Sequence, residues 1–120
     1  MPSAYTMPYN AQISKLKRAR NQRRALLKSL AANMILHKKI HTTEIKAKSV
    51  RPFVERLISI AKKDSVASRR YAARFLPKNA VTALHAVAAG YQERKGGYTR
   101  IVKAAPRRRD NTRMAFIEFV

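Results

Sequence analysis

Residues 39–63 read KIHTTEIKAKSVRPFVERLISIAKK and carry the cleanest periodicity in the chain. In the second half of this stretch, apolar side chains recur at spacings of three and four, the pattern of one face of an α-helix. Basic residues take most of the remaining directions. The stretch therefore predicts a helix with one buried face and one largely basic face. Its apolar positions are Val50, Phe53, Val54, Leu57, Ile58 and Ala61.

The first half of the stretch predicts a strand and a helix start. Residues 39–43 are short and β-branched, and Thr43 could cap a first helical turn over 44–48. Pro52 complicates the helix, because a proline in a helix interior removes a hydrogen bond and costs ~3 kcal/mol. We expect either a kink or a helix that starts afresh near Ser49, because the cost disappears in a first turn.

Three further segments predict helices. The first runs from near Asn21, a plausible N-cap, to near His37. The second is expected over 65–76, between the start signal Asp64-Ser65 and the stop at Pro77, and the third over 79–94. Their core candidates are, in turn, Leu27, Leu30, Ala31, Met34 and Ile35; Val66, Ala73 and Phe75 or Leu76; and Val81, Leu84, Val87, Ala88 and Tyr91.

The C-terminal part changes period, after Gly96-Gly97 breaks the helical pattern. Residues 98–105 and 114–120 are β-branched and aromatic with alternation near two, and the turn formers PRRRDNTR lie between them. This predicts an antiparallel hairpin, which needs a further strand or a helix layer for stability, and residues 39–43 can supply that strand. The predicted fold is a two-layer α+β domain in the order helix, strand, three helices, two strands. We expect residues 1–20 to form an extended arm and residues 21–120 a single domain.

The charge of the chain points to a polyanionic partner. It has 27 Lys and Arg against 6 Asp and Glu, a formal net charge of +21, so a compact state repels itself. Its 46% hydrophobic content nevertheless excludes a merely disordered basic tail. Nucleic acid is the default partner of such a composition. The absence of cysteine excludes disulfides, and neither an apolar run of membrane-spanning length nor a signal-peptide pattern is present.

Catalytic patterns are weak. The six carboxylates stand singly among cations, so no acid–base pair is indicated by spacing. His37 and His41 are separated by a predicted helix end and have no nearby Cys or acidic ligand, so no metal site is predicted there. His85 lies among apolar helix positions and is more typical of a packed histidine. The chain is therefore predicted to be a binder rather than an enzyme, with no cofactor, metal or small-molecule substrate.

The predicted binding residues form clusters whose guanidinium and ammonium groups neutralise phosphates. Tyr98 could stack on a nucleotide, but a strand tyrosine more often packs within the sheet, and both alternatives stay open. The predicted RNA-binding residues are Lys15, Lys17, Arg18, Arg20, Arg23, Arg24 and Lys28; Lys38 and Lys39; Arg69, Arg70 and Arg74; and Tyr98, Arg100, Lys103, Arg107, Arg108, Arg109 and Arg113.

Several motifs in order resemble the seventeenth protein family of the bacterial large ribosomal subunit. They are RRALL at 23–27, IHTTEIKAK at 40–48, GGYTRIVK at 96–103 and IEFV at 117–120, and the likeness runs from about Lys15 to Val120. The resemblance implies a two-layer α/β fold and a non-catalytic protein that binds large-subunit ribosomal RNA. It also implies a place near the polypeptide exit region, beside other ribosomal proteins. The expected localisation is the cytoplasm, in the ribosome, with an organellar ribosome as an alternative.

Two other functions compete with this interpretation. A DNA-compacting protein is permitted by charge, but the chain shows neither a dimerisation heptad nor helix-turn-helix spacing. A preference for structured RNA over duplex DNA at matched salt would separate the two. A cationic membrane-active protein is disfavoured, because the apolar stripes are needed for a mutual core.

Residues 1–14 match nothing expected of the ribosomal family, and Lys17 stands where a glycine is usual.

Overall fold

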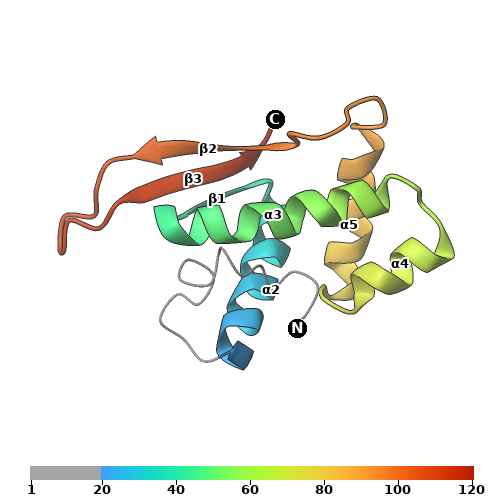
Figure 1. The fold of residues 1–120 in the computed structure, drawn as a ribbon, viewed down its shortest axis with the longest axis horizontal. Coiled ribbons are helices and arrows are strands. Elements are labelled where there is room, and N and C mark those ends of the chain that lie inside the picture. The colour runs from blue at the N-terminus through green and yellow to red at the C-terminus, as the bar shows by residue number, and fades with distance from the viewer. Residues whose placement is uncertain (1–19) are drawn as a thin grey trace.

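The computed structural model describes residues 20–120. Their order of helix, strand, three helices and two strands is the predicted one, and the α+β fold class is confirmed (Figure 1). The elements are α2 (Arg20–His37), β1 (Lys39–Thr43), α3 (Glu44–Ala61), α4 (Val66–Ala73), α5 (Lys78–Ala89), β2 (Thr99–Ala104) and β3 (Met114–Phe119).

The three strands form one antiparallel sheet in the order β1-β3-β2. β2 and β3 are the predicted hairpin, and residues 39–43 supply the third strand, as predicted. The register pairs Ile117 with Ile40 on one side and with Ile101 on the other. Because side chains alternate across a strand, this register directs Ala115, Ile117 and Phe119 to one face of the sheet.

The helices lie on that face. α3 packs against all three strands, α2 packs against β1, and α5 packs against both α2 and α3. Figure 1 shows the sheet above α3, with α4 at the opposite end of the molecule from the hairpin loop. The core between the layers contains Val50, Val54, Leu57 and Ile58 from α3, so the face predicted from residues 39–63 is the buried one. The sheet and the helices thus form the two expected layers.

α3 runs continuously through Pro52, so the expected alternative of a helix that starts afresh near Ser49 is wrong. The helix begins at Glu44 rather than near Ser49, with Thr43 as N-cap. The Thr43 side chain accepts a hydrogen bond of 3.3 Å from the backbone N–H of Lys46. The cap and the buried face together stabilise the first turns, and they hold the helix intact although Pro52 cannot donate to the carbonyl four residues earlier.

α4 and α5 are shorter than predicted. α4 ends at Ala73 instead of residue 76, and it begins with a capping box between Ser65 and Ser68. Its buried face contains Ser68 and Ala72, whereas the predicted core candidate Val66 is 67% exposed and Ala73 is exposed as well. α5 ends at Ala89 rather than Arg94. The sequence spacing allowed either the face with Val66 and Ala73 or the face with Ser68 and Ala72 to be buried. Packing against α3 and α5 buries the face with Ser68 and Ala72.

The start of β2 is held on α3 by one carboxylate. Glu55 accepts hydrogen bonds from the backbone N–H groups of Tyr98 (3.2 Å) and Thr99 (2.9 Å) and from the Thr99 hydroxyl (2.7 Å). One turn earlier on α3, Arg51 donates to the Thr99 carbonyl at 3.4 Å. These bonds fix where the chain leaves the loop after α5 and enters the sheet.

Candidate nucleic-acid interface

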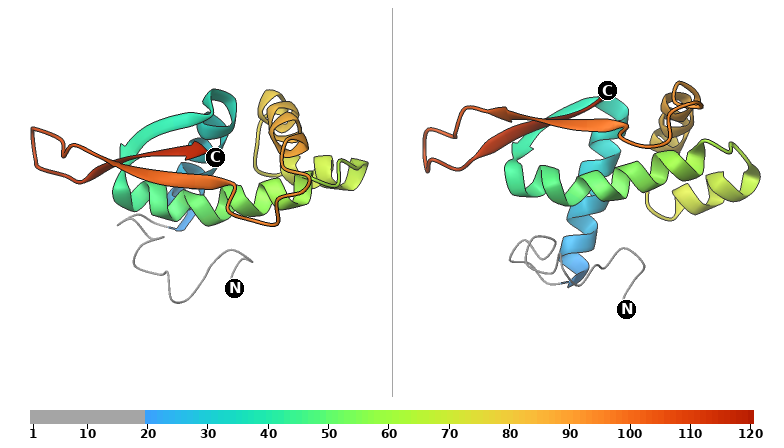
Figure 2. Two further views of the ribbon diagram at one scale, coloured as in Figure 1. Left: turned by 90° about the horizontal axis from the view of Figure 1, so that it is seen from above. Right: turned by 45° about the horizontal axis from the view of Figure 1, so that its top comes forward.

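The predicted cationic clusters lie at separate places on the molecule. The hairpin loop projects beyond the helices at one end of the long axis, α4 lies at the other end, and the beginning of α2 points away from the sheet (Figures 1 and 2). The fold therefore does not bring the clusters into one groove. The sequence has 27 Lys and Arg and only six carboxylates, so its cations far outnumber the acidic side chains that could neutralise them. Such an arrangement suits contact with several segments of a polyanion that surrounds the protein.

The first cluster is carried by α2 and is only partly accessible. Arg20 and Lys28 are exposed, and the Lys28 ammonium lies 5.9 Å from the centre of the Phe75 ring. Arg23 is only 9% exposed, so it is part of the packed side of the helix, and Arg24 is half-buried. The other predicted members of this cluster, at positions 15, 17 and 18, lie outside the described residues, as does most of the predicted arm over 1–20.

The second cluster is carried by α4. Arg69 pairs with Asp64, with 2.9 Å between Nη2 and Oδ1. Arg70 is exposed, and the exposed guanidinium of Arg74 lies 5.7 Å from the centre of the Tyr71 ring. Arg70 and Arg74 thus remain available to a ligand, while Arg69 also holds the turn before the helix.

The hairpin loop is ordered by an internal ion pair. Arg107 donates to both oxygens of Asp110, at 3.1 and 3.3 Å, and its backbone N–H donates to the Thr112 carbonyl at 2.9 Å. Hydrogen bonds from Arg107 and then from Thr112 lower the pKa of the Asp110 carboxyl from 3.8 to about 2. Arg108 and Arg109 are exposed at the tip, and Arg113 is exposed where β3 begins. Arg107 therefore shapes the loop that presents its neighbours.

A row of charges crosses the face of the sheet that points away from the helices. Glu118 of β3 lies between Lys39 of β1 and Arg100 of β2 and pairs with both, at 3.5 Å from Lys39 and 2.6 Å from Arg100. The hydrogen bond from Arg100 is the main cause that lowers the pKa of the Glu118 carboxyl below its usual value. Nearby, Lys38 is exposed with a positive φ of 69° at the α2–β1 junction, and Lys103 is exposed in β2.

Tyr98 is packed inside the protein. Of the two alternatives left open by the sequence, nucleotide stacking on its ring is therefore wrong and packing is correct. It is 2% exposed, and its ring lies 5.3 Å from that of Tyr91. Its hydroxyl donates to the Arg94 carbonyl and accepts from the Lys62 ammonium, each at 3.1 Å. Both faces of the ring are therefore enclosed by protein. A glutamate on α3 that binds the adjacent backbone draws this residue inward, a constraint that strand periodicity does not show.

Sequence reasoning did not single out one aromatic pair in the sheet. The rings of His41 and Phe116, partners across β1 and β3, stack with centroids 4.7 Å apart. The Lys39 ammonium lies 4.5 Å from the centre of the Phe116 ring. The alternation in MAFIEFV was the available signal, because it places Phe116 on the opposite face from Ala115 and Ile117.

One histidine, serine and aspartate lie close together, but their geometry is structural. His85 Nε2 is 3.3 Å from Ser68 Oγ and 3.9 Å from Asp64, and His85 Nδ1 is 3.0 Å from the Val81 carbonyl. Ser68 is buried, donates to the Ser65 carbonyl and accepts from the Ser65 backbone N–H, so its hydroxyl is engaged in the capping box of α4. His85 is packed, as expected.

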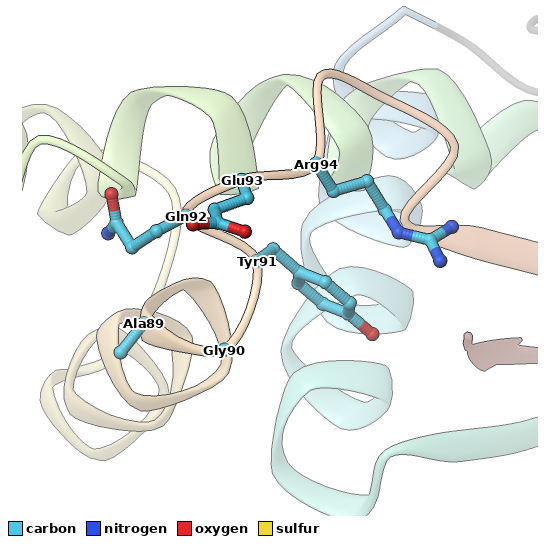
Figure 3. A pocket seen from close by; sticks show the side chains of 6 residues that line it. All are labelled: Ala89, Gly90, Tyr91, Gln92, Glu93 and Arg94. Atoms are coloured by element: carbon cyan, nitrogen blue, oxygen red, sulfur yellow. The ribbon is translucent and has the colours of Figure 1, made fainter.

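The described residues offer little else for chemistry. A hollow beside the turn after α5 is lined by one continuous segment, residues 89–94, and is open to solvent (Figure 3). Residues 20–120 contain no group of three or more His, Cys, Asp or Glu side chains that could hold a metal ion. No helix in this part of the chain is long and apolar enough to cross a membrane.

Comparison with known proteins defines the class. A family model described as ribosomal protein L17 matches residues 26–120. A large ribosomal subunit protein bL17 from Hydrogenobaculum sp. is 47% identical over 117 residues, covering 95% of this chain and 99% of the relative. The proteins of that name from Shouchella clausii and from an Exiguobacterium species are 44% and 46% identical, each covering 89% of this chain and 98% and 97% of the relative.

The class is therefore that of ribosomal proteins, in agreement with a compact basic fold whose cations lie on several sides. The chain belongs to the ribosomal protein L17 family. It is a structural constituent of the ribosome and not an enzyme, and its place is the ribosome in the cytoplasm. The resemblance, the non-enzymatic role and the localisation predicted from sequence are confirmed.

Proposed function

We propose that the chain binds large-subunit ribosomal RNA as a structural protein near the polypeptide exit region, beside other ribosomal proteins. The observation that carries this proposal is the placement of exposed, largely unpaired cations at separate ends of one small fold. Phosphates of different RNA segments can be neutralised by the two ends at the same time. The names of the relatives, large ribosomal subunit protein bL17, support the assignment to this subunit.

The proposed division of labour follows from the contacts. Residues 21–120 form the RNA-binding domain, and residues 1–20 add an arm whose Lys15, Lys17 and Arg18 bind phosphate. In the domain, the hairpin tip, the outer side of α4 and the ends of α2 supply the cations. Recognition relies on phosphate and on RNA shape more than on base sequence. Arg23 contributes through packing, because it is buried.

The hairpin tip gives the sharpest test. The double substitution Arg108→Glu, Arg109→Glu removes two exposed cations while leaving the Arg107–Asp110 pair in place. We expect weaker binding to large-subunit RNA, and a log–log salt slope that is less steep by roughly 0.7 to 0.9 for each lost phosphate contact. The control Lys63→Glu, Lys95→Glu changes the net charge equally at exposed positions outside the proposed clusters.

The two variants separate local contact from total charge. If both change the slope by the same amount, the hairpin tip has no special place in the interface. If the parent protein binds this RNA no better than duplex DNA at matched salt, RNA recognition by the chain is contradicted. Incorporation into large subunits, followed by sedimentation on a sucrose gradient, checks that the binding measured with isolated RNA is the binding used in the ribosome.

A further inference from the structure

The sheet has two faces, and residues 20–120 cover only one of them. Helices α2 and α3 pack on the face that carries Ala115 and Ile117. Figure 2, left, looks onto the opposite face, and no described helix lies between the viewer and the strands. In β3 this face carries Met114, Phe116 and Glu118, of which Met114 is buried and Phe116 is half-buried.

The open face has an aromatic centre. Phe116 lies in the middle strand, with His41 of β1 and Val102 of β2 as its cross-strand partners. His41 is exposed although its ring stacks on Phe116, so the outer side of the stack is accessible. Val102 is 45% exposed, so it adds an accessible aliphatic side chain beside Phe116. The row of the sheet on one side of this centre is charged and consists of Lys39, Glu118 and Arg100, whereas the row on the other side consists of Thr43, Met114 and Ala104.

Cations surround this centre. Lys39 lies over the Phe116 ring, and Arg100 lies on the neighbouring strand. Their shared partner Glu118 is held between them, so its charge is offset, while both cationic side chains remain about half exposed or more. The strands that carry Phe116 and Val102 continue into the loop with Arg108 and Arg109. A negatively charged strand lying along β2 and β3 would meet cations at both ends of the aromatic centre.

We propose that the open sheet face binds unpaired nucleotides of RNA, with a base stacked on the His41–Phe116 pair and the adjoining phosphates at Lys39 and Arg100. Aromatic side chains on an exposed sheet surface stack bases without a strict sequence preference, and flanking cations track the backbone. This deepens the proposed RNA-binding function and rests on it. A protein neighbour fits the same face less well, because half-exposed cations lie beside the aromatic centre and lysine is depleted in protein interfaces.

The test uses the full chain and two RNA probes at matched salt. One probe is an unstructured single strand of about eight nucleotides, within the usual site sizes, carrying 2-aminopurine at its centre. The other is a duplex of the same length. Phe116→Leu keeps an apolar side chain and removes the ring, and His41→Ala changes an exposed position that the core does not need. The control Tyr91→Leu removes a half-buried aromatic ring on the turn after α5, outside the proposed cationic clusters.

Stacking predicts a specific pattern. Phe116→Leu should weaken single-strand binding about fivefold to a hundredfold, from the usual range for one stacked base, and should relieve the quenching of 2-aminopurine. The salt slope should not change, because no cation is removed. His41→Ala should act in the same direction, and neither variant should alter duplex binding. Tyr91→Leu should leave both probes bound as in the parent protein.

Each other result has a defined meaning. Unchanged single-strand binding in both Phe116→Leu and His41→Ala would overturn the proposal and leave the face to a protein neighbour. An equal loss for single strand and duplex would also overturn it, because it would show a general effect on the fold. Arg108→Glu, Arg109→Glu is measured beside them. If only that variant loses RNA, the proposed function stands and the sheet-face site falls; if the parent binds neither probe, the proposed function itself fails.

Discussion

Glu55 of α3 and Thr99 of β2 are joined by two hydrogen bonds to one carboxylate oxygen, from the Thr99 backbone N–H at 2.9 Å and from its hydroxyl at 2.7 Å. The second oxygen accepts from the backbone of Tyr98 at 3.2 Å. A single side chain thus satisfies the first donors of the hairpin at the point where it meets the helical layer. In a chain of net charge +21, this carboxylate has a structural role in addition to its charge.

Replacing Glu55 should therefore destabilise the fold. Glu55→Gln keeps the shape but turns an amide NH2 toward donors, and we expect the free energy of unfolding to fall by about 2 kcal/mol, since hydrogen bonds to a charged group contribute roughly 1.5–3 kcal/mol. Urea unfolding monitored by circular dichroism measures the change. Glu93→Gln, at an exposed position on the turn after α5, is the control and should change stability by less than about 0.5 kcal/mol. An equal effect of both variants would show that only net charge matters.

Pro52 offers the opposite prediction. Pro52→Ala gives α3 a backbone N–H that can donate to the carbonyl four residues earlier, and alanine is about 3 kcal/mol more favourable than proline inside a helix. The proline restrains the unfolded chain by about 0.4–1 kcal/mol, which offsets part of the gain. We expect a net stabilisation of about 2 kcal/mol in thermal or urea unfolding. Ile45→Ala, exposed on the same helix, controls for helix propensity. A loss of stability on Pro52→Ala would show that the ring itself is needed for packing.

Acid should loosen the hairpin loop. The pKa of Asp110 is lower in the folded chain, about 2, than its ordinary value of 3.8, so the ion pair with Arg107 stabilises the loop fully above pH about 4 and is lost as the pH falls toward 2. Carbon-detected NMR of the Asp110 carboxyl should give a midpoint near 2 in the parent protein. In Arg107→Gln the midpoint should return toward 3.8. An unshifted midpoint in that variant would mean that Thr112, and not Arg107, holds the carboxylate.

Much of the fold is encoded locally and could be predicted from the sequence. The alternation in residues 114–120 and the β-branched residues 39–43 specified two strands, and the apolar spacing in residues 39–63 specified the buried face of α3. What failed depended on tertiary contacts. Val66 and Ala73 fitted one helical face as well as Ser68 and Ala72 fitted another, and only packing against α3 and α5 decided between them.

Only part of the candidate interface could be predicted from the sequence. The cations at 107–109 were visible as a charge run in a turn, and they are exposed there. Arg23 and Tyr98 had the right chemistry, but the fold buries both. The His41–Phe116 pair was not visible in either strand alone, because it is created by the pairing of β1 with β3. Composition identifies the kind of partner, whereas strand register determines which side chains can meet it.

The strand order β1-β3-β2 also has a consequence for how the protein is made. β3 is the middle of the sheet but the last of the three strands in the chain, and α3, α4, α5 and β2 are all synthesised between β1 and β3. During translation β1 can form no sheet pair until β3 has left the exit tunnel, because β3 is its only described partner. The helices can begin to pack together first, while Ile40 still lacks its cross-strand partner Ile117. The nascent chain is therefore basic and incompletely folded until β3 has been synthesised. Unless synthesis is completed promptly, this future component of the ribosome can meet RNA before its sheet has formed.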